Sequence, residues 1–176
     1  MFSAAIHIDD HLLSDFFRYL FPPDSKGGPC VISVAHPVGA LMVAFAEASP
    51  AGADTSGEGW IPVDLPKYSN ATTSLVNHYV QFSAESASRI LLALKASFEL
   101  DFQGYYRRGE QLGIQKKDII EAYIFSRGLA PEEFSAMHKR VYRRQQRARE
   151  DIRRRLVRKA YYIDESINYQ GLISEK

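Results

Sequence analysis

A run of basic residues near the C-terminus is the feature that most constrains what this chain can fold into. Residues 139–159 read KRVYRRQQRAREDIRRRLVRK, with eleven Lys or Arg and only two acids, Glu150 and Asp151, so the segment carries a net charge of +9. The whole chain of 176 residues carries +1, which leaves −8 on the remainder. A charge density of this kind requires a polyanion, an acidic protein surface or water around it.

The same segment has helical periodicity. At about 100° per residue, apolar side chains fall within one band about 100° wide, which is interrupted by Gln145 and Lys159. This band, the apolar stripe, consists of Phe134, Met137, Val141, Ala148, Ile152, Leu156 and Ile163. The opposite side, the arginine face, consists of Arg140, Arg143, Arg144, Arg147, Arg154 and Arg158. The pattern predicts a long amphipathic helix that docks by its stripe and presents guanidinium groups outward.

Arginine favours one class of ligand for this helix. Its planar guanidinium matches phosphate and carboxylate, so the first hypothesis is a non-catalytic accessory protein that binds the backbone of DNA or RNA. Such contact would be mostly independent of base sequence, and Lys116 and Lys117 would extend it.

Other partners for the helix remain open. The acids in the rest of the chain would neutralise the arginines within the monomer, or across a homo-oligomer that the helix joins. An acidic protein partner is a further alternative. An anionic membrane surface is disfavoured, because the stripe lacks Trp and is rich in small side chains.

The rest of the sequence predicts an α+β fold. A chain of this length usually makes one domain, and we expect a small, mostly antiparallel sheet with one helix in residues 1–82. Residues 83–176 would be helical and end in the long basic helix, so that one compact domain carries an extended C-terminal helix.

The first 82 residues contain several β-prone segments. Residues 4–8, 30–34 and 60–65 read as strands, and Pro62 and Pro66 place the last of these at a sheet edge. Asp9 or Asp10 would cap a helix with apolar residues from Leu12 to Phe21. Residues 36–39 read as a tight turn into a hairpin strand over 40–48, with a helix as the alternative. Residues 49–59 read as an exposed loop, and residues 75–82 as a strand or the front of the next helix.

The second half of the chain has clear helix signals. Ser83 is a good cap for a helix with apolar residues at helical spacing up to Phe102, and Gly113 breaks it. A helix over 116–127 would end at Gly128, and Pro131 would start the last helix.

Residues 104–123 resemble a helix-turn-helix motif with its turn at 112–114. In that interpretation Gln115, Lys116, Lys117 and Glu121 would lie at the head of a recognition helix. Ala122 and Gly109 depart from the motif, so an ordinary packing turn between two helices is the preferred interpretation.

No motif predicts catalysis. His7, Asp9, Asp10 and His11 crowd the first strand-to-helix junction and are candidate metal ligands, but helix capping explains the aspartates more simply, so we expect no metal. Phosphate-binding loops, dinucleotide glycine patterns and nucleophile elbows are absent, and neither enzyme activity nor a cofactor is expected.

The single cysteine, Cys30, is expected to be buried and fits a cytoplasmic setting. No secretion signal is visible, and the longest apolar run, residues 38–46, is too short for a bilayer span.

Overall fold

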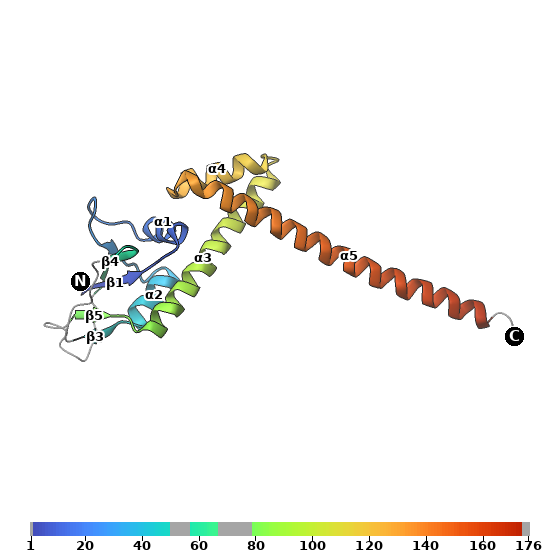
Figure 1. The fold of residues 1–176 in the computed structure, drawn as a ribbon, viewed down its shortest axis with the longest axis horizontal. Coiled ribbons are helices and arrows are strands. Elements are labelled where there is room, and N and C mark those ends of the chain that lie inside the picture. Colours follow the sequence, from blue (N-terminus) through green and yellow to red (C-terminus); the bar gives the residue numbers. More distant parts are fainter. Residues whose placement is uncertain (1, 50–56, 67–78, 174–176) are drawn as a thin grey trace. The chain divides into compact units, whose positions relative to one another are not determined.

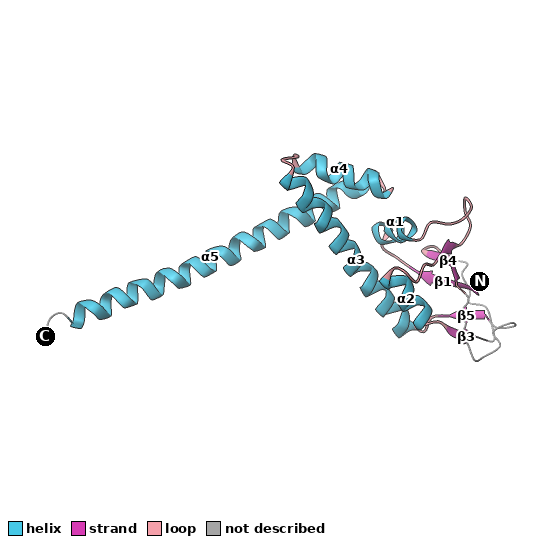
Figure 2. Cartoon of the chain, turned by 180° about the vertical axis from the view of Figure 1, so that it is seen from behind, coloured by secondary structure: helices cyan, strands magenta, loops and turns pink. Residues whose placement is uncertain are grey.

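The computed structural model describes residues 2–49, 57–66 and 79–173. It confirms the α+β class, with a small sheet near the N-terminus and a helical C-terminal half that ends in a long helix (Figures 1 and 2). By their contacts the residues form two compact units, Met1–Glu133 and Phe134–Lys176. The predicted division of the chain at residue 82 stays a prediction.

The strands form two small sheets. In the first, β4 (Trp60–Leu65) lies between β1 (Phe2–His7), to which it is antiparallel, and β2 (Cys30–Val31), to which it is parallel. In the second, β3 (Glu47–Ser49) pairs antiparallel with β5 (Tyr79–Gln81). The strand predicted near the N-terminus is confirmed, and the one predicted over 30–34 is shorter than expected. The loop and strand predicted over 49–59 and 75–82 fall partly outside the described residues.

The predicted edge position of the strand over 60–65 is wrong, because β4 is the central strand. Pro62 lies opposite Ala5 of β1, while pairing with β2 begins only at Val63, opposite Cys30. The ladder with β2 therefore starts one residue after the proline and requires no N–H from it. A short neighbouring strand is what makes a central proline tolerable here.

Helix α1 (His11–Leu20) follows β1 directly. The Asp10 carboxylate accepts a hydrogen bond from the Leu13 N–H at 3.2 Å, which confirms the predicted cap. The helix buries Leu12, Leu13, Phe16 and Phe17. Its outer face is left available for polar residues.

Residues 37–44 form helix α2 (Pro37–Ala44), so the preferred hairpin is wrong, and the described part of residues 1–82 holds two helices rather than one. Pro37 occupies the first turn, where no N–H is needed, and His36 Nδ1 accepts a hydrogen bond from the Val38 N–H at 3.2 Å. A Cβ at Gly39 would lie 2.1 Å from the Ser33 carbonyl oxygen. Glycine is therefore required where this helix meets the preceding backbone.

Helix α3 (Ala84–Gln111) is the scaffold of the first unit. Ser83 Oγ accepts a hydrogen bond from the Ser86 N–H at 3.3 Å, which confirms the predicted cap. The helix contacts α1, α2 and α4, and α1 and α2 lie between the strands and α3 (Figure 1). Its core-facing residues are Ile90, Leu94, Phe98, Phe102 and Tyr106.

Helix α4 (Lys116–Arg127) has the predicted bounds and ends at Gly128, whose φ of 63° is left-handed. Its buried residues form one apolar face: Ile119, Ile120, Tyr123 and Ile124. A 3-10 turn over Pro131–Glu133 follows in the first unit.

The second unit contains helix α5 (Phe134–Ile173), which is 40 residues long and so spans about 60 Å. This confirms the predicted long helix, although it begins at Phe134 and not at Pro131, which lies in the 3-10 turn. Among the residues that the structure describes, no helix combines the length and the apolar content that crossing a bilayer requires.

Candidate functional site

The arginine face of α5 is accessible. Arg143, Arg144, Arg147, Arg154 and Arg158 are exposed, and Arg140 is half-buried. All six lie on the one helix, as predicted. Lys116 and Lys117 are exposed as well, but they begin α4 in the other unit, and Lys117 Nζ lies 3.6 Å from Glu121 Oε1.

Most of the arginine face has no carboxylate partner within the described part of the chain. Arg143, Arg147, Arg154 and Arg158 make no ion pair or side-chain hydrogen bond there, whereas Arg140 and Arg144 each interact with another group. Glu150 and Asp151 lie three or four positions from Arg147 and Arg154, where helical ion pairs form, yet none is made. These four guanidinium groups therefore keep their donors exposed to solvent.

The charge of the segment is close in density to that of a nucleic acid strand. Twenty-one residues of helix span about 31 Å, so the net +9 amounts to about one positive charge per 3.5 Å. One strand of duplex DNA carries a phosphate about every 3.4 Å along its axis. The spacing of positive charge along α5 is therefore better suited to bind a polyanion than to bind one acidic side chain.

The apolar stripe is partly exposed. Ile152 and Leu156 are 58% and 60% exposed, and Val157, which lies off the stripe, is 61% exposed. Val141, Ile152 and Ile163 recur every eleven residues, a period close to that of a straight α-helix, so the stripe does not wind around α5. Ile163 itself lies outside the described side chains.

The turn between α3 and α4 lies where the resemblance to a helix-turn-helix places it. Gly113 has a φ of 74°, and α4 begins at Lys116. A Cβ at Gly109 would lie 2.6 Å from Ile119 Cγ1, so this glycine lets the two helices approach closely. Both interpretations of this turn, the preferred packing turn and the helix-turn-helix, remain open.

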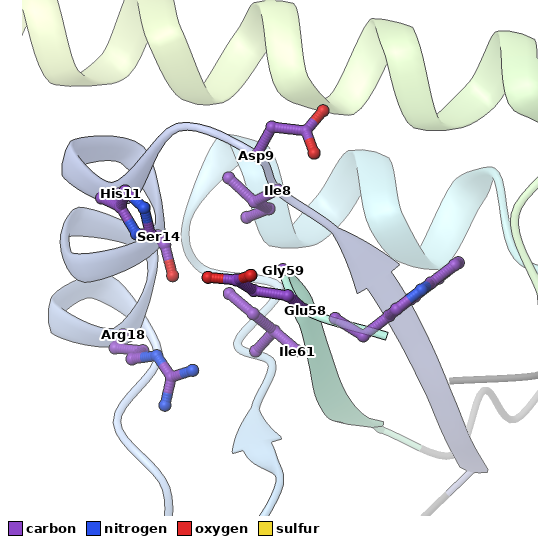
Figure 3. Close-up of a pocket in the computed structure, with 9 residues that line it drawn as sticks. Ile8, Asp9, His11, Ser14, Arg18, Glu58, Gly59 and Ile61 are labelled. Carbon is purple, nitrogen blue, oxygen red and sulfur yellow. The ribbon is translucent and has the colours of Figure 1, made fainter. Parts of the chain in front are cut away.

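A pocket of about 440 Å³ lies beside α1 (Figure 3). It is lined by the two residues that follow β1, by polar side chains of α1 and by residues at and before the start of β4. These are Ile8, Asp9, His11, Ser14, Arg18, Glu58, Gly59, Trp60 and Ile61. Sequence reasoning missed this pocket. The spacing of His11, Ser14 and Arg18 along one helix face was the available signal, but nothing local indicated that Glu58 lies opposite.

The candidate metal ligands near this pocket are only partly brought together. His7 Nε2 lies 3.4 Å from Asp9 Oδ1 and 3.1 Å from the Glu58 carbonyl oxygen, while His11 lines the pocket from α1. Within residues 2–49, 57–66 and 79–173, no three His, Cys, Asp or Glu side chains group closely enough to hold a metal ion.

Cys30 is buried, as predicted. Burial raises the pKa of its thiol, an effect that the charge of Arg18 partly opposes. A buried thiol with a raised pKa is a poor nucleophile, since the thiolate is the reactive form.

Comparison with known proteins adds no further constraint. No protein-family model, curated protein or solved structure matches this chain.

Proposed function

We propose that this protein is a non-catalytic accessory protein that binds the backbone of DNA or RNA through the arginine face of α5, in the cytoplasm. The observation that carries the proposal is the set of exposed guanidinium groups, at Arg143, Arg147, Arg154 and Arg158, that no carboxylate engages within the described residues. Their linear charge density, which is close to that of a nucleic acid strand, adds support.

The binding mechanism is electrostatic. Each guanidinium donates hydrogen bonds to phosphate oxygens and displaces condensed counterions from the nucleic acid. Six such contacts would give a slope of about −5 for log K against log salt on a duplex and about −4 on a single strand. Phosphate contacts fix position without reading bases, so affinity should vary little with base sequence.

Fluorescence anisotropy with labelled 20-nucleotide single strands and 20-base-pair duplexes, over 50 to 300 mM salt, tests the proposal. The double variant Arg154→Gln/Arg158→Gln should reduce the slope by about two on a duplex, because two phosphate contacts are lost. Lys26→Gln/Arg89→Gln removes the same charge from the first unit and should leave the slope unchanged. Absence of binding at 50 mM salt, or an equal effect of both double variants, would rule the proposal out.

A second candidate function is homo-oligomerisation through the apolar stripe. It is favoured by the exposure of Ile152 and Leu156, two large apolar side chains in line on one face of α5. Light scattering should then give an oligomer mass that Ile152→Glu or Leu156→Glu reduces to the monomer. Val157→Glu, at an equally exposed position off the stripe, should keep the oligomer. A monomeric wild type excludes this function.

A further inference from the structure

One wall of the pocket beside α1 is built from a single helix face. His11, Ser14 and Arg18 follow one another at three and four residues, a spacing that aligns side chains along a helix. The opposite face of α1 is buried through Phe16 and Phe17, so the helix cannot rotate to hide these polar groups. All three side chains therefore remain turned toward the pocket.

The facing wall carries Glu58, and its backbone is fixed. The Gly59 carbonyl oxygen accepts a hydrogen bond from the Ile8 N–H at 2.9 Å, and the Glu58 carbonyl oxygen lies 3.1 Å from His7 Nε2. Gly59 has a φ of 85°, and a Cβ there would lie 2.9 Å from His7 Nε2. These contacts with His7 and Ile8 hold the residues that lead into β4, so the backbone position of Glu58 is set before any ligand arrives.

The two walls carry opposite charges that are not paired with each other. Arg18 and Glu58 line the same pocket, yet within the described residues neither side chain has an ion pair or a hydrogen bond. In Figure 3 the Glu58 carboxylate extends toward α1, and Arg18 reaches toward the same gap from the end of that helix.

The remaining polar lining does not cancel this arrangement. Asp9 points away from the gap in Figure 3 and lies 3.4 Å from His7 instead. Ile8 and Ile61 also line the pocket, but both side chains are almost fully buried and add little accessible surface. The pocket thus offers a cation on one side and an anion on the other.

We propose that this pocket binds a small zwitterion, a molecule with one carboxylate, one ammonium group and a short aliphatic chain between them. The carboxylate accepts hydrogen bonds from the Arg18 guanidinium and the Ser14 hydroxyl. The ammonium donates to the Glu58 carboxylate, and the methylene groups span the gap between the two charged side chains. A plain anion would leave Glu58 unpaired beside its own charge, and a plain cation would do the same to Arg18. A volume of about 440 Å³ lies within the range of small-molecule sites.

Calorimetric titration of the full chain with ω-amino acids tests this proposal and measures the separation of the two charged subsites. The series runs from glycine through β-alanine and 4-aminobutanoate to 6-aminohexanoate, at constant ionic strength. Each is matched with the fatty acid and the alkylamine of the same length. We expect one member to bind at least about tenfold more tightly than both of its single-charge counterparts, since each charge-assisted contact contributes about that factor.

Variants assign the binding to the two walls. Arg18→Gln and Glu58→Gln should each weaken the preferred amino acid about tenfold. Arg89→Gln, an equal charge loss on α3, and Arg154→Gln/Arg158→Gln on α5 should leave the affinity unchanged. The proposal is overturned if no amino acid exceeds its single-charge counterparts, or if Glu58→Gln affects binding no more than Arg89→Gln. A ligand that depends on Arg18 but not on Glu58 also overturns it, because the site would then bind anions alone.

Discussion

Arg127 donates two hydrogen bonds to Asp101, from Nε to Oδ2 at 2.9 Å and from a terminal nitrogen to Oδ1 at 3.1 Å, and so joins the last turn of α4 to α3. The Tyr123 hydroxyl donates a third to Asp101 at 3.0 Å. The guanidinium of Arg127 also lies 4.8 Å from the centre of the Tyr19 ring on α1. One carboxylate and one guanidinium therefore fix three helices of the first unit, and the bond to Asp101 is the main cause of the raised pKa of Arg127.

Replacement of Asp101 should loosen this cluster. Asp101→Asn removes the charge that Arg127 and Tyr123 face, and we expect the free energy of unfolding to fall by about 2 kcal/mol, a value typical of a partly buried charged hydrogen bond. Glu85→Gln breaks the exposed pair with Arg89 and should cost less than about 0.5 kcal/mol. Urea denaturation of both variants gives the comparison, and equal costs would contradict the assigned role of Asp101.

Stability should depend on alkaline pH through Tyr123. Burial and the nearby Asp101 carboxylate raise the pKa of this hydroxyl well above its ordinary value of 10.0. The folded state therefore holds the proton more tightly than the unfolded state. The stabilisation is complete below pH 10 and declines as the pH rises further, by up to about 1.4 kcal/mol per pH unit.

The variant Tyr123→Phe isolates that contribution. It should cost about 1 kcal/mol at pH 8, where the hydrogen bond to Asp101 is intact, and this cost should shrink between about pH 10 and 11.5. Denaturant titrations of both proteins at each pH supply the measurement. A cost that stays constant across this pH range would show that the Tyr123 proton is not held by the fold.

Substitution of two glycines of α3 should have opposite effects on stability. A Cβ at Gly109 would lie 2.6 Å from Ile119 Cγ1, so Gly109→Ala should push α4 away and cost about 2 kcal/mol of unfolding free energy. A Cβ at Gly104 would meet no atom of the described residues within 4 Å beyond its own helix backbone. Gly104→Ala should therefore stabilise the protein by about 0.5 to 1 kcal/mol through helix propensity. Thermal melts of the two variants should move in opposite directions.

Replacement of the glycine that leads into β4 should lower the free energy of unfolding by a similar amount. Gly59→Ala forces an L-residue to a φ of 85° and brings its Cβ to 2.9 Å from His7 Nε2, so we expect a loss of about 2 kcal/mol. Gly57→Ala, two residues earlier, meets Trp60 at an ordinary 3.4 Å and should change stability by less than about 0.5 kcal/mol. A similar thermal midpoint for both variants would argue against the fixed backbone next to Glu58.

Local signals predicted the helical half of the fold well. The bounds of α4 followed from Gly113 and Gly128 and from an apolar face at helical spacing, all of which act within one helix length. Helix α2 was misjudged because its residues are almost all apolar, which leaves no amphipathic period to distinguish a helix from a strand. Its Pro37 was the overlooked signal, since proline favours the first turn of a helix.

Features made by distant residues were not predictable in this way. The central position of β4 depends on Phe2–His7 and on Cys30–Val31, which reach it from opposite sides. The pocket depends on the same pairing, because β1 and β4 bring Glu58 to the helix that follows β1. The spacing of His11, Ser14 and Arg18 predicts one polar helix face, but its counterpart lies some forty residues further along the chain.

Asp15 of α1 accepts a hydrogen bond from the Ala130 N–H, a contact between residues 115 positions apart. During synthesis from the N-terminus, β1 cannot pair until β4 has been made. The hydrogen bond between α1 and Ala130 cannot form until almost the whole first unit has left the ribosome. Within the first unit, the segments synthesised earlier thus gain their partners only when the later ones have been made. In the cell, a stalled or truncated chain would display the apolar surface of Phe16 and Phe17 to chaperones and proteases.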